Sequence, residues 1–398
     1  MPEAADALQA EIVATIESGG PLPFARFMKM ALYHPEHGYY SRGLGGGGGR
    51  DYLTSSSLHR LFGVLIARQA AEMWRLLGAP EPFHFVEFGP GEGLFAADFL
   101  EGAATDPDFA RTLRYRLIEP SAALRARQRS RLSRWTHPGV AWWTQEEFEN
   151  VAPFTGCLFA NEVLDAFPVH RVVGTAEGAF EVHVAARCGA LEEVLRPVVD
   201  PAILGFMEEA DIRLEEGQEV DLNLEAPRFL ATALGRLDRG YALIVDYGDE
   251  AAHLYHPARR TGTLRAFHHH RVHDQTLARP GEQDLTAHVD FTAVTRAARR
   301  AGARIVGKVT QGRFLMALGA LESFEEAEGA GAPPGPAGAS VRVEMMRQRE
   351  AMKELILPGR MGDAFHVLIY AAGEVPSGLT GLRDPWERAS LEDAGSCR

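Results

Sequence analysis

Near the end of its first quarter this 398-residue chain reads Phe85-Val86-Glu87-Phe88-Gly89-Pro90-Gly91-Glu92-Gly93. The first half of the stretch is apolar apart from one acid, as expected of a buried strand. The second half is a glycine turn, and glycine tolerates positive φ and lets the backbone approach a ligand closely. The stretch therefore predicts a strand that ends at a pocket for a nucleotide-type cofactor.

The spacing of the glycines separates two kinds of cofactor. The turn has the pattern G-x-G-x-G, whereas the dinucleotide turn G-x-G-x-x-G needs a third glycine where this chain has Leu94. Together with the preceding acid, the pattern fits the first motif of S-adenosylmethionine (SAM) methyltransferases better. An NAD-dependent oxidoreductase, which shares the fold, is the alternative. We expect the cofactor-binding residues of this turn to be Glu87, Gly89, Pro90, Gly91 and Gly93.

A second apolar run also ends in an acid. Tyr115-Arg116-Leu117-Ile118-Glu119-Pro120-Ser121 follows the glycine turn after a helix-like stretch from Leu94 to about Gly102. In a doubly wound sheet the carboxyl ends of successive strands face one crevice, where an acid can accept hydrogen bonds from both ribose hydroxyls. We therefore predict that Glu119 anchors the ribose of the cofactor; a solvated glutamate at a strand end is the simpler alternative.

Further strands alternate with helix-like or polar spacers, which predicts an α/β fold with a parallel, Rossmann-like sheet. We expect these strands at residues 140–143, 157–160, 241–245 and 365–370, and an antiparallel insertion from residue 169 that could form a substrate wall. We divide the chain into N-terminal helices and a lid (1–83), a methyltransferase core (84–321, with the insertion at 169–225), a mobile linker rich in Glu, Gly, Ala and Pro (322–340), and a closing helix, strand and polar tail (341–398).

The fourth predicted strand runs into an amide and two carboxylates: Asn161, Glu162 and Asp165. Methyl transfer is an in-line displacement, so the site must align the acceptor's lone pair and release one proton. A guanidinium acceptor, with a pKa above ~12, would need carboxylates to hold it. Asn161 and Glu162 are thus candidate catalytic residues. Asp165 is a candidate too, or else a helix cap; Asp246, at the next strand end, is either a site acid or a turn residue.

Composition limits the partners. The net charge is −13 and the pI about 5.6, which disfavours broad contact with nucleic acid. Three scattered cysteines suggest neither a disulfide framework nor a zinc site, and the adjacent histidines at 268–270 lack metal-ligand spacing, so we expect no metal. The first twenty residues match neither a secretory signal nor an arginine-rich transit peptide, and no stretch reaches the ~20 apolar residues that span a bilayer. We expect a cytoplasmic protein.

Ordered motifs across the chain go beyond the glycine turn. The chain resembles a family of bacterial and mitochondrial SAM-dependent methyltransferases that includes the arginine methyltransferase assisting assembly of respiratory complex I. The matching stretches are residues 30–40, 51–55, 61–63, 86–93, 117–119, 161–169, 246–248, 262–265 and 284–291.

The resemblance implies a class I methyltransferase fold, SAM as methyl donor and a protein arginine as acceptor, which in the mitochondrial relative belongs to a complex I subunit. It also makes His288 a candidate site residue. One stretch departs from the family: the lid that should read Gly-Asp-Phe-x-Thr-Ser-Pro-Glu here runs from Arg50 to Ser57 without the proline and the final acid. This departure leaves open an assembly chaperone that keeps the fold without turnover. A homodimer is also left open.

Overall fold

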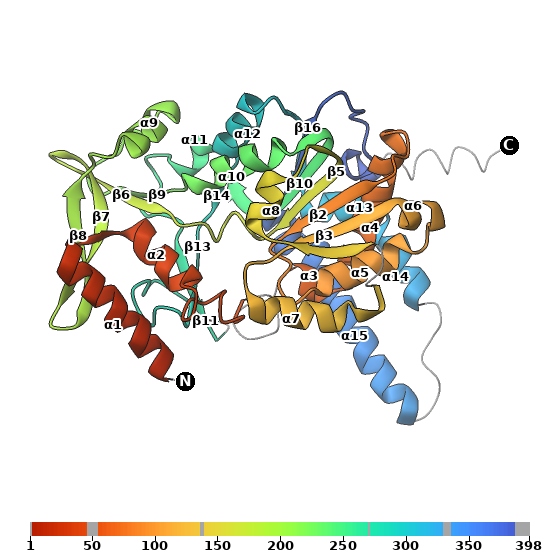
Figure 1. Ribbon diagram of the computed structural model, residues 1–398, viewed down its shortest axis with the longest axis horizontal. Coiled ribbons are helices and arrows are strands. Elements are labelled where there is room, and N and C mark those ends of the chain that lie inside the picture. Colours follow the sequence, from red (N-terminus) through yellow and green to blue (C-terminus); the bar gives the residue numbers. More distant parts are fainter. Residues whose placement is uncertain (1, 46–54, 136–138, 270, 329–335, 387–398) are drawn as a thin grey trace.

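The central element of the computed structural model is a twisted sheet of eight strands (Figure 1). The structure describes residues 2–45, 55–135, 139–269, 271–328 and 336–386. The main path of the sheet is β15-β16-β10-β5-β2-β3-β4, with β14 beside β10. Its strands are β2 (Phe83–Phe88), β3 (Leu113–Ile118), β4 (Val140–Trp143), β5 (Phe154–Asn161), β10 (Leu237–Asp249), β14 (Val289–Asp290), β15 (Arg304–Thr310) and β16 (Phe365–Ala372).

Five neighbouring strands of this sheet, from β4 to β10, are parallel, as predicted. The closing strand β16 lies between β10 and β15 and runs antiparallel to both. The strands predicted at 140–143, 157–160, 241–245 and 365–370 are all confirmed. All these strands end at the same edge of the sheet except β16, so polar residues that follow them meet there.

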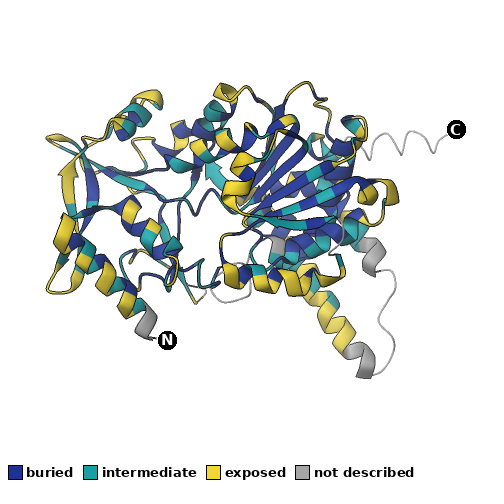
Figure 2. Cartoon of the chain, viewed as in Figure 1, coloured by how far each residue is buried: buried dark blue, intermediate teal, exposed yellow. Residues whose placement is uncertain are grey.

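Helices cover both faces of the sheet, and Figure 2 shows the strands buried between them. One face packs against α4 (Leu61–Leu76), α5 (Leu94–Ala103), α13 (Gln311–Ala317) and α15 (Pro336–Ile356). The other packs against α8 (Gln145–Asn150), α10 (Glu225–Leu234) and α12 (Phe291–Arg300). The remaining helices of the core are α3 (Ser55–Leu58), α6 (Pro107–Thr112), α7 (Ala122–Arg131), α14 (Ala320–Glu328) and α16 (Met361–Ala364).

Two strands approach so closely at one point that only glycine fits. A Cβ at Gly156 in β5 would lie 2.0 Å from the His84 carbonyl oxygen in β2. This close pairing holds the two strands that deliver the glycine turn and the Asn161-Glu162 pair to the same edge.

A second lobe is built from segments that lie far apart in the sequence. The predicted antiparallel insertion is confirmed as β6 (His170–Thr175), β7 (Gly178–Arg187), β8 (Ala190–Pro197) and β9 (Glu219–Leu222), with α9 (Pro201–Glu209) before β9. The N-terminal α1 (Pro2–Gly19), β1 (Leu22–Pro23) and α2 (Phe24–Tyr33) join it, as do α11 (Ala251–Leu254), β11 (Arg265–His268), β12 (Arg271–His273) and β13 (Asp284–Thr286).

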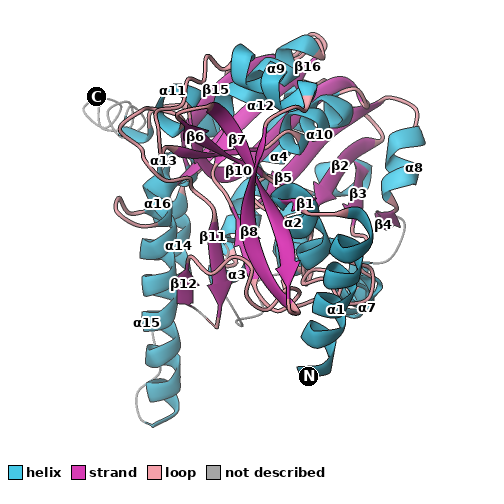
Figure 3. Ribbon diagram, turned by 90° about the vertical axis from the view of Figure 1, so that its left-hand side faces the viewer, coloured by secondary structure: helices cyan, strands magenta, loops and turns pink. Residues whose placement is uncertain are grey.

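Two of the predicted boundaries differ from this arrangement. The N-terminal unit 1–83 is divided in the structure, because the apolar stripe of Leu8, Ile12 and Ile16 packs on the second lobe, whereas α4 packs on the core sheet. The predicted linker 322–340 is helical at both ends, where α14 and α15 use the helix-favouring alanine and glutamate of this segment. Figures 1 and 3 show α15 extending away from the body of the protein.

No described helix is both long and apolar enough to cross a membrane.

Candidate active site

The glycine turn connects β2 to α5 at the carboxyl edge of the sheet. Gly89, Gly91 and Gly93 have φ values of +62°, +51° and +76°, a region that other residues rarely adopt. A Cβ at Gly89 would lie 3.0 Å from Val163 Cγ2. Gly93 is the N-cap residue of α5, and a Cβ placed on it would lie 3.2 Å from the side chain of Gln128. The sequence of the turn is thus dictated by backbone conformation and by the close approach of neighbouring segments.

A pocket of about 300 Å³ opens beside this turn. Most of its lining comes from four segments: the turn itself, the ends of β3 and β5, and the end of α2 with the chain that follows it; Gln145 of α8 and Phe229 of α10 also line it. Predicted residues in the lining are Glu87, Gly89, Pro90, Gly91, Glu119, Asn161 and Glu162. Gly93, Asp165 and His288 are not among the described residues that line it. No residue of the 169–225 insertion lines it either, so the insertion does not form the expected wall of this pocket.

Two buried carboxyl groups face the cofactor side of the pocket. Glu87 Oε2 accepts a 2.6 Å hydrogen bond from the Tyr115 hydroxyl, and burial raises the pKa of Glu87 to about 8. Glu119 Oε1 accepts a 2.7 Å hydrogen bond from the Ser121 amide. Burial raises the pKa of Glu119 to about 7, although the Ser121 amide and Arg125 oppose the shift. Gln128 also hydrogen-bonds Glu119. A ligand can therefore bind the second oxygen of Glu87, and it can bind Glu119, which titrates near neutrality, in place of Gln128.

The Asn161-Glu162 pair stands at the end of β5, on the opposite side of the turn. Glu162 has φ +53°, an uncommon conformation for a non-glycine residue. Its Oε1 accepts hydrogen bonds from the Ser55 amide (2.9 Å) and from Asn161 Nδ2 (3.1 Å). Burial and the neighbouring Asp165 raise the pKa of Glu162 to about 8. Asn161 Oδ1 is buried and has no hydrogen-bond partner among the described residues.

More carboxyl groups lie directly behind this pair. Asp246 Oδ2 accepts hydrogen bonds from the Leu164 and Asp165 amides (2.9 and 3.4 Å), which fixes the loop after β5. Burial raises the pKa of both Asp165 and Asp246, and the charges of Asp165 and Glu162 raise the pKa of Asp246 further. Tyr247 hydrogen-bonds Asp165 and lies 2.5 Å from the Thr286 hydroxyl. Asp165 is thus a buried acid in a network and does not cap a helix.

His288 belongs to the support of this network. Its amide donates to the Thr263 hydroxyl (3.0 Å), and its ring packs edge-on against Tyr247 with 5.4 Å between ring centres. Burial, followed by Arg259 and Arg265, lowers the pKa of the imidazole. Within the described part of the chain, no three His, Cys, Asp or Glu side chains gather in a way that could hold a metal ion.

Aromatic side chains form one side of the pocket, and the sequence predicted only some of them. Tyr33 and Tyr40 stack with 5.4 Å between ring centres; the Tyr33 hydroxyl donates to the Ala166 carbonyl (3.0 Å) and the Tyr40 hydroxyl to Asp284 Oδ1 (2.8 Å). Tyr33 and Tyr40 lie in the stretch 30–40 that matches the family, whereas Gln145 and Phe229 carry no sequence signal for a pocket. Residues 46–54, which include most of the predicted lid from Arg50 to Ser57, lie outside the described residues.

Residues 65–309 match the family model of S-adenosyl-L-methionine-dependent methyltransferases. The chain belongs to this methyltransferase family. It is 32% identical over 339 residues to the mitochondrial protein arginine methyltransferase NDUFAF7 homolog of Drosophila melanogaster, covering 78% of this chain and 74% of the relative. The human NDUFAF7 protein is 30% identical over 332 residues, with 76% and 71% covered.

Solved structures agree with the family. A protein from Burkholderia thailandensis, crystallised with S-adenosyl-homocysteine, is 32% identical, covers 95% of both chains and superimposes with a TM-score of 0.82. The class I methyltransferase fold is thereby confirmed, as is SAM as the methyl donor of this enzyme. The nicotinamide alternative is set aside.

Proposed function

We propose that this methyltransferase transfers methyl groups from SAM to a guanidinium nitrogen of arginine in a partner protein. The observation that carries the proposal is a group of three carboxyls beside the cofactor pocket: Glu162, which lines it, and Asp165 and Asp246, which are buried behind Glu162. No lysine or arginine in the described part of the chain forms an ion pair with any of the three. Buried carboxylates are normally paired, so the site is suited to receive a cation from outside.

The pocket residues fit the methyl donor. Gly89, Pro90 and Gly91 would face its amino-acid end, where a side chain on Gly89 would meet Val163. The Glu119 carboxylate would accept hydrogen bonds from the ribose hydroxyls. The unpartnered Oδ1 of Asn161 and the second oxygen of Glu87 are further acceptors for the donor's ammonium and hydroxyl groups. When bound, SAM supplies a sulfonium methyl group as the electrophile.

Glu162 and Asp165 would hold the acceptor. A guanidinium that enters the site stabilises their ionised forms, so it should release the protons that burial keeps on them. Glu162, held by the Ser55 amide and Asn161, would then orient one nitrogen toward the pocket. The new carbon–nitrogen bond forms as the carbon–sulfur bond breaks, its electron pair stays on sulfur, and a carboxylate accepts the proton lost from nitrogen. We assign His288 a positioning role, through Tyr247.

The names of the relatives support the arginine acceptor, since both the fruit-fly and human proteins are protein arginine methyltransferases. A complex I subunit as the acceptor follows only from the resemblance, and it enters this proposal as the first protein to test. Cytoplasmic location, the absence of nucleic-acid binding and a homodimer stay predictions; the curated relatives are mitochondrial proteins.

The test is a labelling experiment with a protein extract. The purified enzyme is incubated with SAM that carries an isotopically labelled methyl group and with extract from cells lacking the gene, and the tryptic peptides are sequenced by mass spectrometry. We expect labelled methyl groups on arginine, absent from reactions with Glu162→Gln. Label confined to lysine, to carboxyl groups or to small molecules would overturn the arginine assignment, whereas the SAM dependence would stand.

A further inference from the structure

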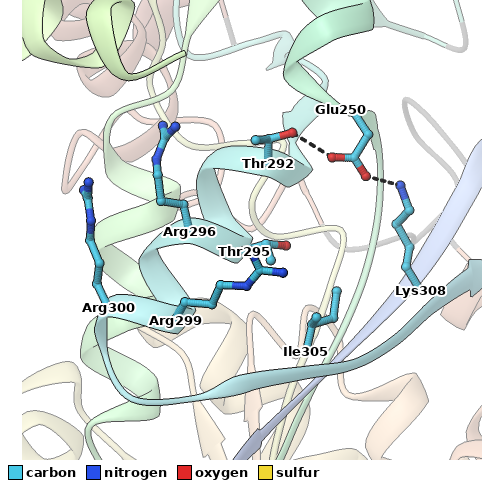
Figure 4. A pocket seen from close by; sticks show the side chains of 8 residues that line it. All are labelled: Glu250, Thr292, Thr295, Arg296, Arg299, Arg300, Ile305 and Lys308. Carbon is cyan, nitrogen blue, oxygen red and sulfur yellow. Dashed lines mark hydrogen bonds and ion pairs between the residues drawn. The ribbon is translucent and has the colours of Figure 1, made fainter.

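A second pocket lies outside the methyl-transfer site, between α12 and the edge strand β15 (Figure 4). It has a volume of about 560 Å³. Four of its lining side chains are cationic: Arg296, Arg299 and Arg300 from α12, and Lys308 from β15. Glu250, directly after β10, is the one acid among the lining residues. Such a gathering of positive charge is unusual on a chain whose net charge is −13.

Ion pairs hold most of these cations in place without neutralising all of them. Lys308 pairs with Glu250, which also accepts a 2.7 Å hydrogen bond from the Thr292 hydroxyl. Arg300 binds both carboxylate oxygens of Glu209 in α9 at 3.1 Å. Arg296 shares the same carboxylate. Asp249, next to Glu250, also interacts with Lys308. Four cations thus face three acids, so the pocket keeps a positive charge.

Arg299 is the cation that these pairs leave over. No carboxylate in the described part of the chain forms an ion pair with it, and Figure 4 shows its side chain directed between α12 and β15. Cations in the last turn of a helix also stabilise the helix dipole, which explains why arginines stand at the end of α12. The dipole does not explain why Lys308 converges on the same pocket from a separate strand.

The sheet topology separates this pocket from the methyl-transfer site. Four strand steps lie between β15 and β2, which carries the glycine turn. At ~4.8 Å for each step, this corresponds to roughly 19 Å. A ligand in this pocket would therefore not overlap a cofactor bound at the glycine turn.

We propose that the pocket binds a small, multiply charged oxyanion of the phosphate class, such as a phosphate-bearing metabolite. Guanidinium groups present paired N–H donors that match the oxygens of a phosphate, and a lysine adds a point charge. The volume suits a compact ligand better than an extended acidic peptide. This inference does not depend on the identity of the methyl acceptor.

Inorganic pyrophosphate is the probe for the test, titrated calorimetrically into the full-length enzyme at low ionic strength. We expect a dissociation constant in the roughly millimolar range or tighter. Arg299→Gln should weaken binding about tenfold, as loss of one charged hydrogen bond implies, and Lys308→Gln should weaken it similarly. Arg347→Gln, which removes an exposed arginine of α15, is the matched control and should bind as the wild type does. Higher salt should weaken binding by screening.

Three results would overturn the proposal: no heat of binding, an affinity that both pocket variants leave unchanged, or capture of a hexaglutamate peptide in preference to pyrophosphate. Affinity for S-adenosyl-homocysteine provides the check on folding. It should be the same in the wild type and in Arg299→Gln, so failure here is distinct from failure of the arginine-acceptor proposal.

Discussion

The most informative single change is Glu162→Gln, which removes one negative charge and keeps the shape of the side chain. Both hydrogen bonds to Glu162, from the Ser55 amide and from Asn161, end on the same oxygen, and an amide oxygen can accept them. The variant should therefore fold and bind S-adenosyl-homocysteine normally. If Glu162 holds the acceptor guanidinium, the rate of methyl transfer should fall by about 100-fold or more, the range found for losing a positioned acid, base or electrostatic group.

The same change should stabilise the folded protein, with a defined pH dependence. The pKa of Glu162 lies at about 8 in the folded chain, against 4.5 for an ordinary glutamate. Between these values the group is protonated when folded and ionised when unfolded. The free energy of unfolding of the wild type therefore falls as pH rises through this window. Glutamine avoids the loss, which at ~1.4 kcal/mol for each pKa unit reaches ~3 kcal/mol at pH 7.

Two measurements check these expectations. Urea unfolding at pH 6 and pH 8.5 should show the stability advantage of Glu162→Gln growing by ~2 kcal/mol between the two. Methyl incorporation into protein extract gives the rate. Glu17→Gln, an exposed change on α1, is the matched control and should alter neither quantity. A variant that methylates within threefold of the wild type would refute the role of Glu162, and a stability difference independent of pH would refute its raised pKa.

Three further changes test the cofactor pocket and the sheet. Gly89→Ala should weaken S-adenosyl-homocysteine binding about tenfold or more by calorimetry, because its Cβ enters at 3.0 Å from a neighbouring side chain in a backbone of positive φ. The pKa of Glu119 is about 7, and its ionised form would accept hydrogen bonds from the ribose hydroxyls. The affinity for S-adenosyl-homocysteine should therefore rise from pH 6 to pH 8, and Glu119→Gln should remove that rise. Gly156→Ala should lower the free energy of unfolding by ~2 kcal/mol or more in urea, because its Cβ would lie 2.0 Å from the His84 carbonyl.

Two glycines elsewhere provide matched controls. Gly78 has φ +84° and open space around its Cβ position, so Gly78→Ala should strain the backbone without changing cofactor affinity. Gly205 lies inside α9 with open space, so Gly205→Ala should be neutral or stabilising. If Gly89→Ala and Gly78→Ala bound the cofactor equally well, the glycine turn would not be part of the binding site. If the affinity for S-adenosyl-homocysteine did not change with pH, Glu119 would not bind the ribose.

The sequence predicted the parts of the site that lie at strand ends. A parallel strand is a short apolar run, and the residue that follows it is placed at the carboxyl edge whatever the rest of the chain does. For this reason Glu87, Glu119 and Asn161 could be assigned to one pocket before the structure was known, and all three line it. Asp165 and His288 are also predicted site residues, but neither lines the pocket. The spacing of residues along the sequence does not show how far a side chain lies from the pocket.

The contributions of the second lobe could not be predicted in this way. Periodicity showed that Leu8, Ile12 and Ile16 form one face of a helix, but not that this face packs on strands from the 169–225 insertion and on β11 and β13. That long-range packing positions α2, and with it Tyr33 and the stacked Tyr40. The antiparallel placement of β16 between β10 and β15 is equally non-local.

The consequence for function is that each lobe supplies a different half of the site. The core sheet provides the acids, whose charge is fixed by burial at strand ends, whereas the second lobe provides the tyrosines, which reach Ala166 and Asp284 by hydrogen bonds. Asp284 lies on β13 of the second lobe and contributes to the raised pKa of Glu162 in the core. A shift of one lobe relative to the other would therefore change both the aromatic wall and the charge state of Glu162. Acceptor binding, which adds positive charge between the lobes, should stabilise the arrangement in which these carboxyls lie closest together.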